Sequence, residues 1–104
     1  PAPAYIIDQN KFVYLYDPMK GVYVFDYYGG YQSRIPFTGW SDFEVINKAL
    51  FGRDKNYLYR YDMGSLQLQQ IPAPSFMNNA QKIIVFPGNA YILKDGVFMV
   101  YSYN

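Results

Sequence analysis

The sequence contains an internal repeat. The segment 22–26 (VYVFD) matches the segment 58–62 (LYRYD), and the same shift places the dipeptide 35–36 on the identical dipeptide 71–72. A second, slightly longer shift places 58–61 (LYRY) on 98–101 (FMVY). Repeats of this length are typical of folds in which one supersecondary unit stacks on copies of itself.

Turn-forming residues divide each repeat into short segments. In the middle repeat, Gly, Asn, Asp and Pro separate four predicted strands, at residues 43–46, 49–52, 57–62 and 66–71. A helical turn or two over 43–51 is the competing prediction for that segment. The first repeat divides in the same way, and the third ends one strand short. We therefore expect two complete four-stranded antiparallel units and a third that lacks its outer strand.

The aromatic content supports strands. Aromatic residues make up 21% of the chain, with 13 Tyr and 8 Phe, and these residue types favour pleated, half-buried surfaces. Both alternating sets of side chains in the strand at 22–25 are apolar or aromatic, whereas a sheet with one solvated face shows polar residues at every second position. The pattern predicts an all-β protein built of stacked β-propeller blades. An ordinary β-sandwich or a flat meander is the alternative.

The predicted blades cover residues 4–37, 43–74 and 81–104, in a single partial propeller domain. A closed propeller needs about four to eight blades. We therefore expect the chain to be a fragment of a longer protein, with Pro1 at a cut between blades. Such a piece exposes two apolar blade faces, so we expect it to associate with itself or with the remainder of its parent chain.

Composition argues against several kinds of function. The chain has no His and no Cys, which removes imidazole bases, thiol nucleophiles and most zinc ligands. We expect no metal site, no cofactor and no enzymatic activity of its own. The net charge is +1 without a run of Lys or Arg, so nucleic-acid binding is not expected. No apolar stretch has the roughly 18 residues of a transmembrane helix.

The segment that runs from Gly21–Asp26 through Gly29-Gly30 to Arg34–Phe37 resembles β-propeller repeats of the NHL-like and six-bladed bacterial type. The segment 56–62 repeats its first part. The resemblance implies the propeller fold and favours a periplasmic or outer-envelope location. It carries no catalytic or metal-binding residues over to this chain. The Trp-Asp dipeptide of the WD40 branch is missing.

Loops at one end of such blades are where function is expected, because binding residues concentrate on loops held by a rigid scaffold. Trp40, the only Trp, lies in one of these loops, and Arg53 and Lys55 lie in another. An exposed Trp40 would stack on a sugar or anchor a partner; the alternative is a ring packed between two blades. Tyr31 is a further candidate for stacking on a sugar.

Asp26 and Asp62 occupy equivalent positions at the ends of strands. Aspartate at such a position binds the backbone of its own turn, or it holds a cation or accepts a proton. We favour the structural role, because no carboxylates show the spacing of a calcium loop or of an acid/base pair.

The leading hypothesis is a non-catalytic propeller scaffold or binding module. The alternative is a carbohydrate-binding or carbohydrate-active propeller fragment. An enzyme whose catalytic carboxylates lie on blades outside this chain is a third possibility. A protein or a glycan is therefore the expected ligand.

Overall fold

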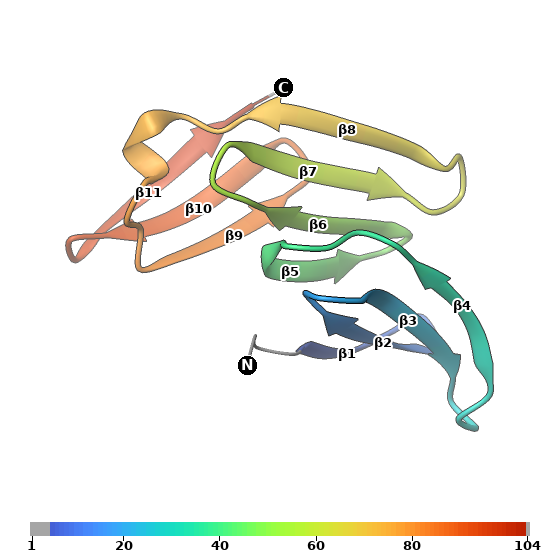
Figure 1. Ribbon diagram of the computed structural model, residues 1–104. Helices are drawn as coiled ribbons and strands as arrows, with labels where there is room; N and C mark the ends of the chain where they lie inside the picture. Colours follow the sequence, from blue (N-terminus) through green and yellow to red (C-terminus); the bar gives the residue numbers. More distant parts are fainter. Residues whose placement is uncertain (1–4, 104) are drawn as a thin grey trace. The chain divides into compact units, whose positions relative to one another are not determined.

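The structure is a computed structural model that describes residues 5–103. This part of the chain is all-β, with eleven strands in three antiparallel sheets of four, four and three strands (Figure 1). The prediction of an all-β chain is confirmed. Two compact units make up the chain, residues 1–41 (unit 1) and residues 42–104 (unit 2).

Unit 1 holds the first sheet, in which each strand pairs with the next one along the chain. Its strands are β1 Tyr5–Gln9, β2 Phe12–Asp17, β3 Gly21–Asp26 and β4 Tyr31–Ile35. Asn10 and Lys11 join the first two strands with φ values of 52° and 66°, a backbone typical of two-residue hairpins. The predicted cut between blades at Pro1 lies outside the described residues.

One face of the first sheet is buried and the other is partly open. The buried face carries Tyr14, Tyr16, Val22 and Val24. The open face carries the half-buried Leu15, Tyr23 and Phe25 and the exposed Ile6. The alternation in the sequence therefore separates two apolar faces, as the pattern at 22–25 predicts.

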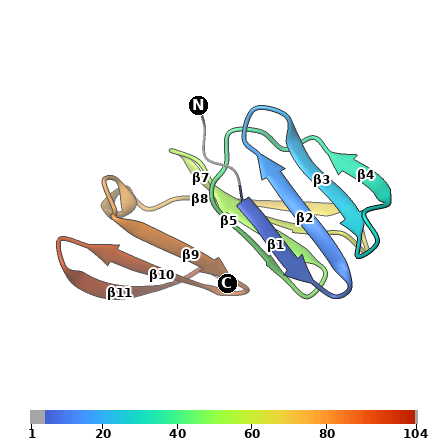
Figure 2. The same ribbon diagram turned by 90° about the horizontal axis from the view of Figure 1, so that it is seen from below.

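Strand β5 continues the chain into unit 2, which contains the other two sheets. The second sheet has the order β5-β6-β7-β8, and the third sheet has the order β11-β10-β9, with β11 at its edge (Figure 2). A short 3-10 helix, η1, connects them. The bounds are β5 Ser41–Ile46, β6 Ala49–Arg53, β7 Tyr57–Asp62, β8 Gln67–Pro72, η1 Ser75–Met77, β9 Lys82–Phe86, β10 Asn89–Lys94 and β11 Val97–Ser102.

The competing helix over 43–51 does not form. Asn47, with φ at 56°, turns the chain between β5 and β6. Asparagine tolerates this left-handed backbone better than most residues, because its short polar side chain bonds locally. A hairpin turn thus interrupts the segment at the point where a helix would need to continue.

The positions of the strands reproduce the internal repeat. Strands β3, β7 and β11 begin at Gly21, Tyr57 and Val97, which are the intervals of the two shifts that align the sequence with itself. The three sheets are therefore structural copies, and the third lacks a counterpart of β8 among the described residues.

A hydrophobic core joins the two sheets of unit 2. The second sheet contributes Ala49, Phe51 and Leu58, the third sheet contributes Ile83, Val85, Ala90 and Ile92, and η1 contributes Met77. Full burial of each large side chain stabilises the fold by about 1.5–3 kcal/mol. The second sheet thus packs one apolar face on the third sheet.

Candidate functional site

Three loops of unit 2 meet at one end of its sheets, and we call this surface the rim, defined as residues 54–56, 73–81 and 95–96. The N–H of Ala73 donates to the carbonyl of Asn56 at 2.8 Å. The N–H of Gly96 donates to the Gln81 side chain at 3.1 Å, which ties the third loop to the second. Hydrogen bonds therefore hold the rim together as one surface.

The middle loop of the rim, residues 73–81, is anchored in the hydrophobic core of unit 2. Met77 is buried in the core between the sheets, and its neighbour Phe76 is 41% exposed. The Phe76 ring meets the edge of the Tyr101 ring at 5.8 Å, and Lys94 donates to the Phe76 carbonyl at 2.8 Å. The result is an exposed aromatic side chain on a backbone with little freedom to move.

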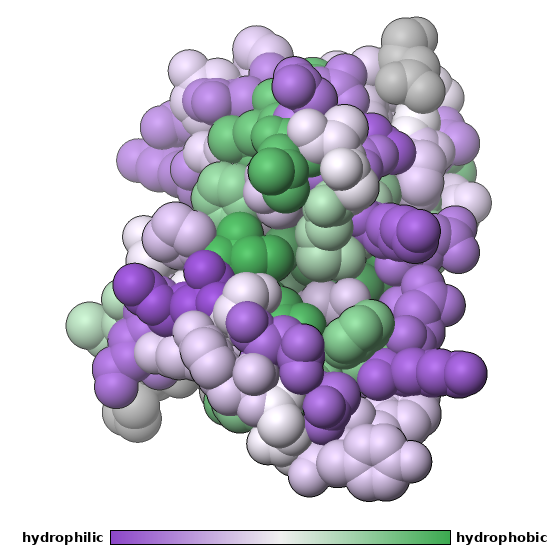
Figure 3. Space-filling view, turned by 90° about the vertical axis from the view of Figure 1, so that its right-hand side faces the viewer, coloured by the Kyte–Doolittle hydropathy of each residue, from purple (hydrophilic) through white to green (hydrophobic). Residues whose placement is uncertain are grey.

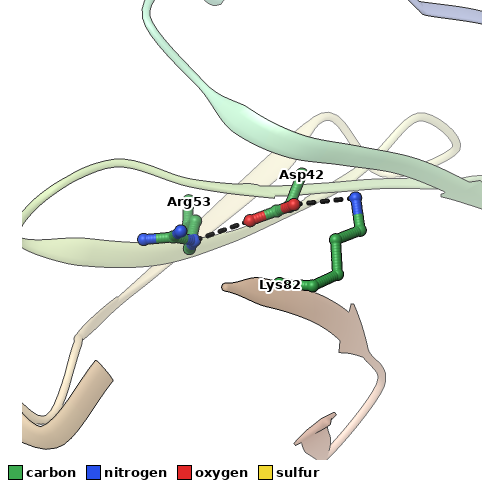
Figure 4. A network of polar contacts seen from close by, with 3 residues as sticks. All are labelled: Asp42, Arg53 and Lys82. Carbon is green, nitrogen blue, oxygen red and sulfur yellow. Dashed lines mark hydrogen bonds and ion pairs between the residues drawn. The ribbon is translucent and has the colours of Figure 1, made fainter. Parts of the chain in front are cut away.

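A charged network lies beside the rim (Figure 4). Each carboxylate oxygen of Asp42 accepts one ionic hydrogen bond at 2.8 Å, from Arg53 Nε and from Lys82 Nζ. The Asp42 side chain is nearly buried, Arg53 is largely buried, and Lys82 is half exposed. The network joins the start of β5 to the end of β6 and to the start of β9, so it connects the two sheets of unit 2 at the end that carries the rim.

The backbone of Asp42 supports its central position. Its φ of 51° lies in the left-handed region, which Asp and Asn visit more readily than other residues with a side chain. Burial raises the pKa of the neighbouring Glu44 carboxyl; the charge of Lys82 lowers that pKa and the charge of Asp42 raises it.

Asp54 organises the first loop of the rim. One of its oxygens accepts the N–H groups of Asn56 and Tyr57 at 2.8 and 2.9 Å, and the other accepts the Tyr59 hydroxyl. Partial burial acts to raise the pKa of Asp54, but these hydrogen bonds outweigh it and the pKa is lowered. Burial, followed by the bond to Asp54, raises the pKa of Tyr59 to about 12. The loop that carries Lys55 is therefore fixed by its own side chains.

The structure brings two of the four predicted binding residues together. Arg53 and Lys55 both lie where β6 turns into β7, with Lys55 exposed and Arg53 paired to Asp42. Lys55 belongs to the rim itself. Their role in binding stays a prediction.

Trp40 is packed rather than presented to solvent. It is 5% exposed, and its ring stacks on Phe37 with centroids 4.8 Å apart and planes 10° from parallel. Its backbone N–H donates to the buried Tyr16 hydroxyl at 2.8 Å. A sugar needs an open ring face, so the burial favours the interpretation of Trp40 as a packing residue.

Tyr31 is 60% exposed and meets the ring of Phe25 edge-on at 5.9 Å. It begins β4, whereas Trp40 follows that strand and binds Tyr16 at the other end of the sheet. A five-residue strand spans about 17 Å. Tyr31 and Trp40 therefore lie at opposite ends of the first sheet.

Asp26 and Asp62 both cap the turn that follows their strand. Asp26 accepts the N–H groups of Tyr28 and Gly30, and Asp62 accepts those of Gly64 and Ser65, all at 2.7–2.9 Å. The predicted structural role of both residues is confirmed.

Sequence reasoning did not single out Phe76 or Asp42. The signal for Phe76 is an aromatic residue within a run of turn-forming and polar residues, PAPSFMNN at 72–79. No local signal points to Asp42, because its partner Lys82 belongs to a different sheet and lies far along the chain.

Comparisons of the chain with protein-family models, with curated proteins and with solved structures found no match. The resemblance to NHL-like propeller repeats therefore rests on the residues of this chain alone. Within residues 5–103, no helix is long and apolar enough to cross a membrane.

Proposed function

We propose that this chain is a non-catalytic scaffold of β-propeller blades that binds a protein partner through the rim. The observation that carries the proposal is the construction of unit 2, where two copies of one sheet share a core and their loops join into a rigid surface. Rigid loops on a repeated scaffold are typical of binding surfaces.

The blade arrangement is supported by the way the repeat packs. Antiparallel four-stranded sheets that recur about every 40 residues are typical of propeller blades. Strands β3, β7 and β11 recur at a similar spacing. In unit 2 the apolar face of one such sheet is covered by the next copy and not by a helix. An experimental structure with the sheets side by side in one flat layer would contradict this part of the proposal.

The composition of the rim supports a protein as the partner. Phe76 offers an exposed aromatic anchor, and the rim also carries the exposed polar residues Lys55, Asn78 and Asn79. A central aromatic within a polar border is the usual organisation of a protein–protein hot spot. The resemblance to bacterial propellers supports a periplasmic or outer-envelope location for this binding.

Carbohydrate binding receives no support from the residues first considered for it. Trp40 is buried and Tyr31 lies at the opposite end of the first sheet, so the two rings do not stand together as one stacking surface.

The test is capture of partners from an extract of the source organism on the immobilised chain. Three versions are compared: the natural sequence, the double variant Lys55→Ala/Phe76→Ala, and the control Tyr28→Ala, whose side chain is 98% exposed in the β3–β4 turn. We expect a protein retained by the natural chain and the control, and bound at least about tenfold more weakly by the rim variant, as loss of an anchor residue implies.

Equal retention by all three versions would contradict the rim as the binding surface. A glycan array on the same three proteins, with Trp40→Phe added, examines the alternative. Binding of one glycan class that is lost in Trp40→Phe would favour the carbohydrate hypothesis over ours.

A further inference from the structure

The third sheet has an apolar face that points away from the core of unit 2. We call it the free face. The strand register places it opposite the core residues Ile83, Val85, Ala90 and Ile92. Phe98 is the most exposed of its members, at 66%. The free face consists of Ile84, Phe86, Tyr91, Leu93, Phe98 and Val100.

The free face is an ordered surface. The rings of Phe86 and Tyr91 have centroids 5.2 Å apart, and those of Tyr91 and Phe98 are 5.7 Å apart. Three aromatic side chains from three strands thus contact one another in a row. Figure 3 views the molecule from the right-hand side of Figure 1, where hydrophobic side chains (green) lie among hydrophilic ones (purple); the free face is not part of this view. A contiguous apolar surface on a protein typically marks an interaction site.

The internal repeat indicates what kind of surface covers the free face. Under the shift that places 58–61 on 98–101, Tyr91 corresponds to Phe51 and Phe98 corresponds to Leu58. Both Phe51 and Leu58 are fully buried, because the next sheet of the repeat packs on them. The free face is therefore the copy of a surface that, one repeat earlier, is covered by a sheet.

A sheet face suited to that place occurs in the chain itself. It is the open face of the first sheet, which carries Ile6, Leu15, Tyr23 and Phe25. Ile6 is 75% exposed. A groove of about 350 Å³, lined by Leu15, Tyr23 and Phe25 with Asp17 and Lys20, hollows the same face. An apolar groove of this size accepts large side chains such as those of the free face.

From these two faces we infer that a second copy of this chain docks the open face of its first sheet on the free face of the third sheet. The contact joins two different surfaces, so it is head-to-tail. The inference rests on the proposed blade arrangement. Each chain has three sheets, so two copies bring together six sheets. Closed propellers have about four to eight blades, a range that six sheets fit and that the nine sheets of three copies exceed. The expected assembly is a dimer with two equivalent contacts.

The size of the face explains why two contacts are needed. Strand β9 has five residues and β10 and β11 have six each, so the sheet covers about 17–20 Å by about 14 Å, or roughly 240–280 Å², from the spacings of a sheet. A stable interface buries about 800 Å² per partner. One contact of this size is weak, and closure of the ring makes the second contact intramolecular. The dimer is expected to dissociate on dilution.

The experiment measures the mass of the whole chain in solution by size-exclusion chromatography with light scattering. We expect twice the 12.1 kDa of one chain at high concentration. Phe98→Arg places a charge in the free face, and Leu15→Arg places a charge in the open face, so each variant loses one of the two docking surfaces. Each variant alone is expected to be monomeric, with dimerisation weakened at least about tenfold. An equimolar mixture of the two has one intact contact, between the open face of Phe98→Arg and the free face of Leu15→Arg. We therefore expect it to associate more strongly than either variant alone and more weakly than the natural chain.

Tyr28→Arg, which changes an exposed turn outside both faces, is the matched control and is expected to remain dimeric. Circular dichroism confirms that each variant is folded. If Leu15→Arg does not fold, Ile6→Arg replaces it on the same face, and Val100→Arg serves in the same way for Phe98→Arg.

A natural chain that is monomeric at every concentration overturns the inference. A Leu15→Arg variant that dimerises as well as the natural chain also overturns it, because the contact then joins two free faces. The rim assay separates these outcomes from the proposed function: a monomer that still binds its partner through Phe76 leaves that function standing, and a dimer without rim-dependent binding leaves the docking contact standing.

Discussion

Replacing Asp42 is expected to destabilise unit 2 by an amount that follows from its contacts. Asp42→Asn keeps the shape and the tolerance for a left-handed backbone but removes the charge that binds Arg53 and Lys82. A hydrogen bond to a charged, largely buried group contributes about 1.5–3 kcal/mol. The contact with the half-exposed Lys82 adds less than about 1 kcal/mol, because solvent screens it. We expect Asp42→Asn to lower the free energy of unfolding by about 2 kcal/mol.

Asp42→Ala is expected to cost about 1 kcal/mol more than Asp42→Asn, because alanine at a φ of 51° adds backbone strain of that order and makes no hydrogen bond to either cation. The matched control is Asp95→Asn, in an exposed turn with the same φ of 51°. That control removes an equal charge at an equal backbone geometry, and we expect it to change stability by less than about 0.5 kcal/mol.

The measurement is urea unfolding followed by far-ultraviolet circular dichroism, with thermal unfolding as a second readout. A loss of about 2 kcal/mol corresponds to a fall in Tm of roughly 8–16 °C for a chain of this size. Lys82→Met is expected to cost less than Asp42→Asn, because it leaves the Arg53 contact in place. If Asp42→Asn is as stable as Asp95→Asn, the network does not hold the two sheets together and the reasoning fails.

Three further perturbations have expected outcomes. Since the folded-state pKa of Asp54 is lowered, the stability it contributes is present above its unfolded pKa and is lost as the pH falls through the lowered pKa. Tyr59→Phe removes one cause of the lowered pKa and is expected to flatten that dependence of stability on pH in urea titrations at several pH values. Ile92→Ala is expected to cost about 2–5 kcal/mol because it opens a cavity in the core, whereas Leu93→Ala on the free face costs less than about 1 kcal/mol in the same assay. Gly21→Ala places a Cβ 2.5 Å from a backbone oxygen of β4 at a φ of 113°, so we expect it to lower the Tm. A Tm close to that of the natural chain would contradict the described β3–β4 contact.

Local features of the fold were predictable from the sequence. The alternation at 22–25 identifies β3, and the matching segment one repeat later identifies β7. Asp26 and Asp62 cap their turns through hydrogen bonds that reach two to four residues along the chain. Such interactions depend only on residues within the segment, so the sequence pattern contains them.

The candidate site was predictable only in part, because tertiary contacts form it. The polar neighbours of Trp40 suggest an exposed loop, and its ring is buried because the chain folds back to stack it on Phe37. Asp42 meets Lys82 only when two sheets pack together. Arg53 and Lys55 were found from their loop position, which strand boundaries determine.

The edge strand β11 has one more consequence. Under the repeat it corresponds to β7, an inner strand whose outer side is covered by β8. The outer strands β4 and β8 are rich in Gln, Ser and Arg, but the sequence of β11 is VFMVYS, without charge or proline. Strand β11 therefore has a row of backbone donors and acceptors at the sheet edge, next to side chains of high β-propensity. This combination promotes fibril growth by strand addition. Concentrated samples of this chain are expected to form thioflavin-positive fibrils from that edge, and a single lysine at Val100 should delay them.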